Sequence, residues 1–123
     1  MPMPSLPEVL RDRTKQFAIR IVRLFRHLPK TDEARVFGRQ VLRSGTSAPP
    51  NYRAVCRAKS PPDFVSKMGT VVEEADETLL WLELFEEAEV FPAEELKDLK
   101  READELRRML SSSLGTARHE TAR

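Results

Sequence analysis

Cysteine is nearly absent from the sequence, with Cys56 the single one among 123 residues. One cysteine excludes an internal disulfide and any zinc site built from several cysteines. Long hydrophobic runs are missing as well, since no segment has the ~20 apolar residues that a membrane-spanning helix needs. Residues 1–5 have neither a basic start nor an apolar stretch, so we expect no signal peptide, no membrane association and a cytoplasmic location.

The sequence also has few of the residues that catalysis and metal binding require. Its four glycines are scattered and form no phosphate-binding loop, and no arrangement of serine, histidine and aspartate suggests a catalytic triad. The carboxylates of residues 73–77 invite a metal site, but a bundle-core site needs a histidine three residues after a glutamate. Neither His27 nor His119 has that spacing, and Cys56 has no histidine near it in sequence to act as a base. We therefore predict that the protein is not an enzyme and has no catalytic residues, no metal and no cofactor.

What the chain does contain fits one small helical domain. At 123 residues it is too short for two well-filled cores, and 40% hydrophobic residues are too many for a disordered segment. Apolar residues recur at helical spacing, and no stretch alternates polar and apolar residues for long enough to propose a strand. We expect residues 1–115 to form a single four-helix-bundle domain and residues 116–123 to form a polar, frayed tail.

Capping residues and prolines divide the chain into four predicted helices. Ser5, either Thr31 or Asp32, and Ser60 stand before helical stretches and can cap them. The connections are short, which favours an all-α, antiparallel up-down four-helix bundle. The predicted helices cover about residues 7–28, 32–58, 60–88 and 92–114, the last of them ending at Gly115.

The second predicted helix should be kinked or broken near Pro49 and Pro50. Two adjacent prolines remove two amide donors and push the residues before them out of the helical region. We expect an interruption over residues 44–50, followed by a short helical piece over residues 51–58.

Apolar side chains at intervals of three and four predict the inner face of each helix. Gly69 stands in the middle of the third helix, which suggests that another backbone approaches closely there. The predicted core residues are Leu10, Phe17, Ile21, Leu24 and Leu28 in the first helix; Phe37, Val41 and Leu42 in the second; Val65, Met68, Val72, Ala75, Leu79 and Leu82 in the third; and Leu96, Leu99, Ala103, Leu106 and Leu110 in the fourth.

Two stretches carry more apolar surface than one bundle core needs. The first helix has a second apolar stripe, and residues 78–85 of the third are apolar on almost every side. We interpret both as a subunit interface, with Trp81 as its anchor. The alternative is a wide inner face that the second helical segment covers. The candidate interface residues are Ala18, Val22, Phe25, Leu80, Trp81 and Leu84.

Charge is strongly segregated along the chain. Residues 1–60 carry 13 basic and 4 acidic side chains, whereas residues 61–91 carry 1 basic and 9 acidic ones. This asymmetry predicts either a nucleic-acid-binding surface in the basic half or oppositely charged helices that lie side by side. The candidate nucleic-acid-binding residues are Arg20, Arg23, Arg26, Lys30, Arg35, Arg39, Arg43, Arg53 and Arg57.

Several motifs resemble those of a bacterial family known as four helix bundle proteins or 23S rRNA intervening-sequence proteins. Residues 39–53, RQVLRSGTSAPPNYR, resemble the family's signature. Residues 58–64 (AKSPPDF), 74–78 (EADET) and 81–84 (WLEL) are similar to its third helix. The likeness covers roughly residues 10–115, and it departs from the family pattern where two prolines replace the usual single proline of the kink.

The resemblance implies an up-down four-helix bundle and a homo-oligomeric ring, with a pentamer favoured, and it implies no enzymatic activity or cofactor. A distantly similar group of pentameric bundles serves as an accessory to the reverse transcriptases of diversity-generating retroelements, where it engages nucleic acid and the polymerase. Two functions are therefore open. One is a ring that binds nucleic acid, RNA in preference to DNA; the other is a scaffold that docks a protein partner, for example a reverse transcriptase, without contacting nucleic acid.

Overall fold

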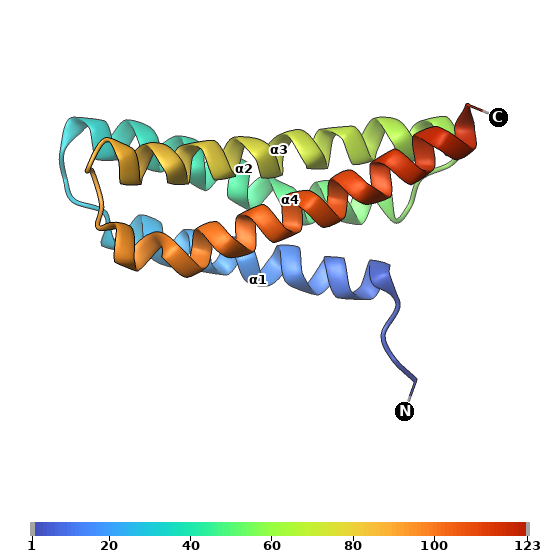
Figure 1. The fold of residues 1–123 in the computed structure, drawn as a ribbon, viewed down its shortest axis with the longest axis horizontal. Coiled ribbons are helices and arrows are strands. Elements are labelled where there is room, and N and C mark those ends of the chain that lie inside the picture. Colours follow the sequence, from blue (N-terminus) through green and yellow to red (C-terminus); the bar gives the residue numbers. More distant parts are fainter. Residues whose placement is uncertain (1, 123) are drawn as a thin grey trace.

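The chain folds into four α-helices joined by short connections. In the computed structural model, which describes residues 2–122, the helices are α1 (Leu6–His27), α2 (Asp32–Val55), α3 (Pro61–Glu87) and α4 (Ala93–Thr121), and these residues form no strand. Successive helices run up and down the long axis of the molecule, and α4 returns to the side of α1 (Figure 1). The predicted all-α four-helix bundle is confirmed.

Polar side chains cap the first three helices. The hydroxyl groups of Ser5 and Thr31 each accept a hydrogen bond from the amide three residues further on, both at 3.3 Å. Before α3, the Ser60 hydroxyl accepts the amide hydrogen of Asp63 at 3.2 Å, and the Asp63 carboxylate accepts that of Lys59 at 2.9 Å. These bonds satisfy amides that have no partner within the helix, and so they define where each helix begins.

The core runs the length of the bundle between the inner faces of the helices. The predicted inner stripe of α4 is confirmed, because all five residues are buried and Leu114 extends the stripe. In α1, the predicted residues from Leu10 to Leu24 are buried and Leu28 is half-buried. The buried residues of α3 are Met68, Val71, Ala75, Thr78, Leu82 and Phe85.

The inner face of α3 is rotated relative to the predicted one. Val65, Val72 and Leu79, predicted to line the core, are half-buried at its edge. Thr78 occupies a core position instead, and its polar side chain hides the true stripe in the sequence. The buried Thr78 hydroxyl keeps hydrogen-bond partners, because it bonds to Ser44 Oγ and to the backbone carbonyl of Glu74, each at 2.8 Å.

α2 continues through Pro49 and Pro50, so the predicted interruption over residues 44–50 is wrong and the predicted kink is not confirmed. The helix also ends at Val55 rather than at residue 58. The buried residues of α2 repeat at intervals of four and three both before and after the prolines. The free energy gained by burying them outweighs the ~3 kcal/mol that a proline costs inside a helix. These residues are Ala34, Gly38, Val41, Gly45, Ala48, Tyr52 and Val55.

Two glycines allow α1 to approach α2 closely. A Cβ atom on Gly45 would lie 2.9 Å from Ile21 Cγ1, and one on Gly38 would lie 2.8 Å from Leu28 Cδ1. The close approach predicted at Gly69 is wrong, because no atom would lie within 4 Å of a Cβ there. The tight helix contact therefore lies between α1 and α2.

α4 runs past Gly115 to Thr121, so the predicted helix end at Gly115 is wrong. A glycine that ends a helix does so by adopting a positive φ, and none of the glycines has one. Inside a helix, a glycine costs only about 1 kcal/mol relative to alanine. Met1 and Arg123, which belong to the predicted domain and tail, lie outside the described residues.

Candidate oligomer and nucleic-acid surfaces

The second apolar stripe of α1 lies along its border with α2. Ala18 and Val22 are half-buried there, and Phe25 is 37% exposed. The Phe25 ring comes within 3.4 Å of the position that a Cβ would take on Gly38, so α2 covers one side of the stripe. What is left open is a narrow apolar surface, the α1 strip (Ala18, Val22 and Phe25).

Trp81, the predicted interface anchor, is half-buried against α2. Its ring lies 5.6 Å from that of Phe37, centroid to centroid, and Phe37 in turn meets Phe85 edge to face at 5.7 Å. The Trp81 Nε1 atom is buried and has no hydrogen-bond partner among the described residues. Phe37 of α2 thus packs against part of the Trp81 ring, in the way that the alternative of a wide inner face predicts.

Leu80 and Leu84 lie beside Trp81 on the side of α3 turned away from the core. Leu80 is 49% exposed and Leu84 is half-buried. Val36 of α2 is 55% exposed and was not predicted from the sequence. It directly precedes Phe37, whose ring packs against Trp81 and Phe85 of α3, so Val36 lies at the same height along the bundle as these residues. These three residues form the α3 patch (Val36, Leu80 and Leu84). A lone valine among charged neighbours gives no periodic signal, and only its exposure identifies it.

The structure therefore divides the predicted interface into two separate surfaces. The α1 strip borders the α1–α2 contact, whereas the α3 patch borders the α2–α3 contact. The strip and the patch lie on different sides of the four-helix bundle. One flat contact with another molecule therefore does not cover both.

The cations of α1 and of its connection to α2 lie in two directions. Arg23, Arg26 and Lys30 are exposed, and no ion pair among the described residues involves them. Arg20 is half-buried and lies two turns beyond Arg13, on the side of α1 that faces α4. Arg13 itself joins the two helices: it bonds to Glu102 at 2.6 Å and pairs with Glu105 at 3.2 Å. The hydrogen bond to Glu102 raises the pKa of Arg13 above its ordinary value.

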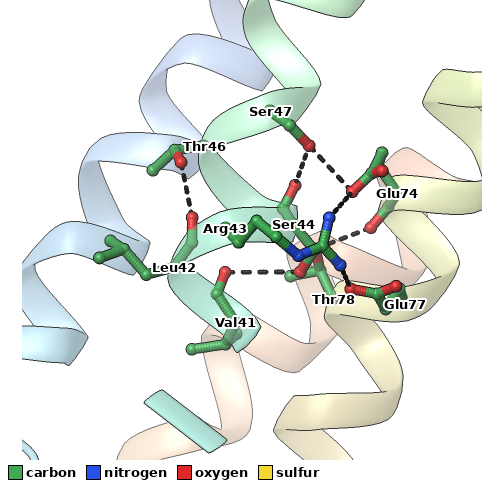
Figure 2. Close-up of polar contacts among 9 residues, drawn as sticks. All are labelled: Val41, Leu42, Arg43, Ser44, Thr46, Ser47, Glu74, Glu77 and Thr78. Carbon is green, nitrogen blue, oxygen red and sulfur yellow. Dashed lines mark hydrogen bonds and ion pairs between the residues drawn. The ribbon is translucent and has the colours of Figure 1, made fainter. Parts of the chain in front are cut away.

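The predicted ladder of arginines on α2 is divided by its partners. Arg43 reaches across to α3, where it pairs with Glu77 and, at 3.5 Å, with Glu74 (Figure 2). Ser47 donates to the same Glu74 carboxylate at 2.9 Å, so this corner of the α2–α3 contact is closed by its own bonds. Arg43 is therefore already neutralised within the chain.

The other two members of the ladder are freer. Arg35 is exposed and has a single, long contact of 3.8 Å to the exposed carboxylate of Asp32. Arg39 is exposed and forms no ion pair with any residue in the range 2–122. The same holds for Arg53 and Arg57 at the other end of α2.

Two further cations escaped sequence reasoning. Arg11 and Lys15 continue the α1 strip towards the N-terminus at the same spacing of four and three, and both are exposed. Their signal is this shared spacing with Ala18, Val22 and Phe25. The exposed cations of α1, α2 and the connections that follow these two helices define the basic face: Arg11, Lys15, Arg23, Arg26, Lys30, Arg35, Arg39, Arg53 and Arg57.

Acidic side chains lie around Leu80 and Leu84 of the α3 patch, whereas Val36 has Arg39 one turn further along α2. Glu73, Asp76 and Glu87 are exposed on α3, and Glu77 and Glu83 are half-buried.

Within residues 2–122, no three histidine, cysteine, aspartate or glutamate side chains gather closely enough to hold a metal ion. In that same part of the chain, no helix is both long and apolar enough to cross a membrane.

Comparison with known proteins identifies a family and similar solved structures. The model of the 23S rRNA-intervening sequence protein family matches residues 9–112. A protein of unknown function from the S23 ribosomal protein family of Bacteroides thetaiotaomicron is 34% identical, with a TM-score of 0.81 over 89% of this chain and 97% of that chain. No functionally curated protein matches.

Proposed function

Since the chain belongs to the 23S rRNA-intervening sequence protein family, we propose that it is a non-enzymatic, ring-forming homo-oligomer that binds nucleic acid through its basic face. RNA is the expected ligand because the family's name refers to an rRNA, and DNA is tested beside it. A pentamer is the expected ring, from the family resemblance.

The observation that supports nucleic-acid binding is the set of exposed cations in the basic face, which have no carboxylate partner among the described residues apart from the long contact of Arg35 with Asp32. Such cations displace counterions from a phosphate backbone, and the resulting affinity falls steeply with salt. A ring repeats the basic face in every copy, so that one nucleic acid meets several faces at once and gains in avidity.

The α1 strip and the α3 patch support a head-to-tail contact between copies. Arg35 belongs to the helix that borders the strip, whereas the carboxylates of α3 lie around Leu80 and Leu84 of the patch, so the two surfaces are complementary in charge as well as apolar. A contact between two different surfaces is heterologous, and heterologous contacts that close produce rings.

This arrangement assigns different tasks to different cations. Arg35 would lie at the subunit contact, opposite the carboxylates of the neighbouring α3. Arg23 lies on the outward side of α1, Arg26 lies at the edge of the strip one turn after Val22, and Lys30 lies in the connection to α2; all three are exposed and would remain available to phosphates.

The test is the triple variant R23Q/R26Q/K30Q, measured by fluorescence anisotropy with a labelled RNA hairpin and a DNA duplex from about 50 to 200 mM salt. We expect weaker binding and a slope of log K against log salt that is smaller by about 0.9 for each lost contact with a duplex phosphate. The ring mass by light scattering should not change.

The matched control is K97Q/R101Q/R108Q, which removes three exposed cations from α4. Its binding should equal that of the original protein. If the ring forms but binds neither RNA nor DNA in a salt-dependent way, the nucleic-acid proposal is wrong and a scaffold for a protein partner takes its place.

A further inference from the structure

The bundle is open at the end that holds both chain termini. There α1 and α4 diverge (Figure 1), and a cleft of about 1030 Å³ lies between all four helices. Ligand sites in proteins are concave spaces of this order, mostly apolar and with a few polar groups. No residue of the basic face, the α1 strip or the α3 patch lines the cleft.

The cleft arises from a change of residue size along α4. The inner stripe of α4 consists mainly of leucines as far as Leu114, but the residues that face the cleft are Ser113, Ala117 and Thr121. These side chains are too small to fill the space between α4 and the start of α1. The sequence thus leaves the last turns of the core without a filling side chain.

The walls of the cleft are apolar and include core residues. They are formed by Leu6, Tyr52, Val55, Phe64 and Met68 from the three other helices. Tyr52 and Met68 are buried in the bundle, and burial raises the pKa of Tyr52 to about 12. Leu6, by contrast, is 50% exposed at the edge. An apolar molecule in the cleft would cover these surfaces and be stabilised by the water it displaces.

Two charged residues line the cleft. Lys59 lies in the connection between α2 and α3, and its side chain forms no ion pair within the described part of the chain. Glu120, near the end of α4, is the one acidic residue of the lining and has no ion-pair partner in residues 2–122. The lining thus offers one cation to an anionic group, while Glu120 repels a second negative charge on the same ligand.

We infer that this cleft binds a long-chain alkyl carboxylate, with the alkyl chain against Tyr52, Phe64 and Met68 and the carboxylate at Lys59. Lys59 complements one negative charge, and the apolar walls favour an alkyl chain over a polar small molecule. The inference goes beyond the proposed function and stands or fails independently of nucleic-acid binding.

The experiment titrates the full chain with dodecanoate by isothermal calorimetry, below the critical micelle concentration. We expect saturable binding to each subunit, tightening about fourfold for each additional buried CH₂ when decanoate and dodecanoate are compared. Cys56 also lines the cleft and is the only cysteine, so bound dodecanoate should slow its reaction with a thiol reagent.

Two variants test the site itself. Ala117→Trp fills the cleft and should weaken dodecanoate binding about tenfold or more, whereas Thr116→Trp places the same bulk on the neighbouring exposed position and should leave binding unchanged. Lys59→Met lies in a connection, where it does not endanger folding, and should weaken dodecanoate binding about fivefold. Circular dichroism checks that each variant is helical.

Three results would overturn the inference. They are no saturable binding of dodecanoate, equal binding of dodecyltrimethylammonium, and unchanged dodecanoate binding in a folded Ala117→Trp or Lys59→Met variant. Loss of RNA binding in the triple variant of α1 has no bearing on this result, so failure of the proposed function is distinguished from failure of the cleft.

Discussion

The side chain of Ile21 presses directly on the backbone of α2 at Gly45. A Cβ atom at that position would meet three Ile21 atoms between 2.9 and 3.2 Å away. Ile21 is branched at Cβ and fully buried, so it has no alternative rotamer into which it can retreat. The glycine is therefore required by packing and not by a special backbone conformation.

Gly45→Ala should lower the free energy of unfolding by about 1–3 kcal/mol, because the added methyl group overpacks the α1–α2 contact. Gly69→Ala is the matched control: the site is helical and open, so the same change should raise the free energy of unfolding by about 0.5–1 kcal/mol. Urea denaturation of both variants measures the difference. Equal effects at the two sites would contradict the close approach at Gly45.

Tyr52, the only tyrosine, provides a direct report of the cleft wall. Burial is the main cause that raises its pKa from 10.0 to about 12, followed by the charge of the neighbouring Cys56 thiolate. Since the folded pKa lies above the unfolded one, the stabilisation from the neutral phenol is complete below pH 10 and is lost as the pH rises towards 12. Absorbance at 295 nm should give a titration midpoint near 12 in the folded protein; a midpoint near 10 while the helices persist would contradict the burial.

Among the elements, α2 is the one whose sequence and structure disagree most. Its buried face depends on small residues, Ala34, Gly38, Gly45 and Ala48, which carry little hydrophobicity and so do not mark a stripe. The prolines, by contrast, give a strong local signal for a break. Packing against α1 and α3 along the whole helix overrides that signal, and a tertiary contact of this kind is not visible in the local sequence.

Pro50→Ala tests whether α2 is held continuous against the preference of its own sequence. Pro50 is exposed inside the helix, so alanine restores an amide donor without disturbing the core. We expect the free energy of unfolding to rise by about 1–2 kcal/mol, since the helical cost of proline exceeds the entropy it removes from the unfolded chain. Pro61→Ala, at the first position of α3, should not stabilise the protein, because proline is well suited to that position.

The other three helices could be predicted where the sequence carries a strong local pattern, and their ends were missed where it does not. The leucine stripe of α4 and the caps at Ser5 and Ser60 are strong local patterns, and all are confirmed. The end of α4 was missed because Gly115 is compatible with both a helix end and a helix interior. The candidate surfaces were only partly predictable, since the sequence gives the face of one helix but not the neighbour that covers it, as with Trp81 and Phe37.

Over the whole molecule, the segregated basic residues divide into two groups: some pair with carboxylates of the same chain, and the others stay exposed. Internally, Arg43 joins α2 to the carboxylates of α3, and Arg13 joins α1 to those of α4. These pairs correspond to the alternative in which oppositely charged helices lie side by side. The basic face is the remainder that these internal pairs leave unsatisfied, and it is this remainder that the proposed ring would use.

A mixing experiment tests the head-to-tail contact. Phe25→Glu places a charge in the α1 strip, and Leu80→Glu places one in the α3 patch; both positions are exposed enough to accept it. Each variant alone should be a monomer of about 14.1 kDa by light scattering, because every contact in a ring uses one strip and one patch.

Mixing the two variants should give a dimer and nothing larger, since the intact patch of the Phe25→Glu chain pairs with the intact strip of the Leu80→Glu chain and both remaining surfaces are blocked. An isologous contact predicts otherwise. If strip met strip, the Leu80→Glu variant would form dimers without its partner, and if patch met patch, the Phe25→Glu variant would do so. Dimers of a single variant, or a mixture that stays monomeric while both variants are helical, would therefore exclude the strip-to-patch ring.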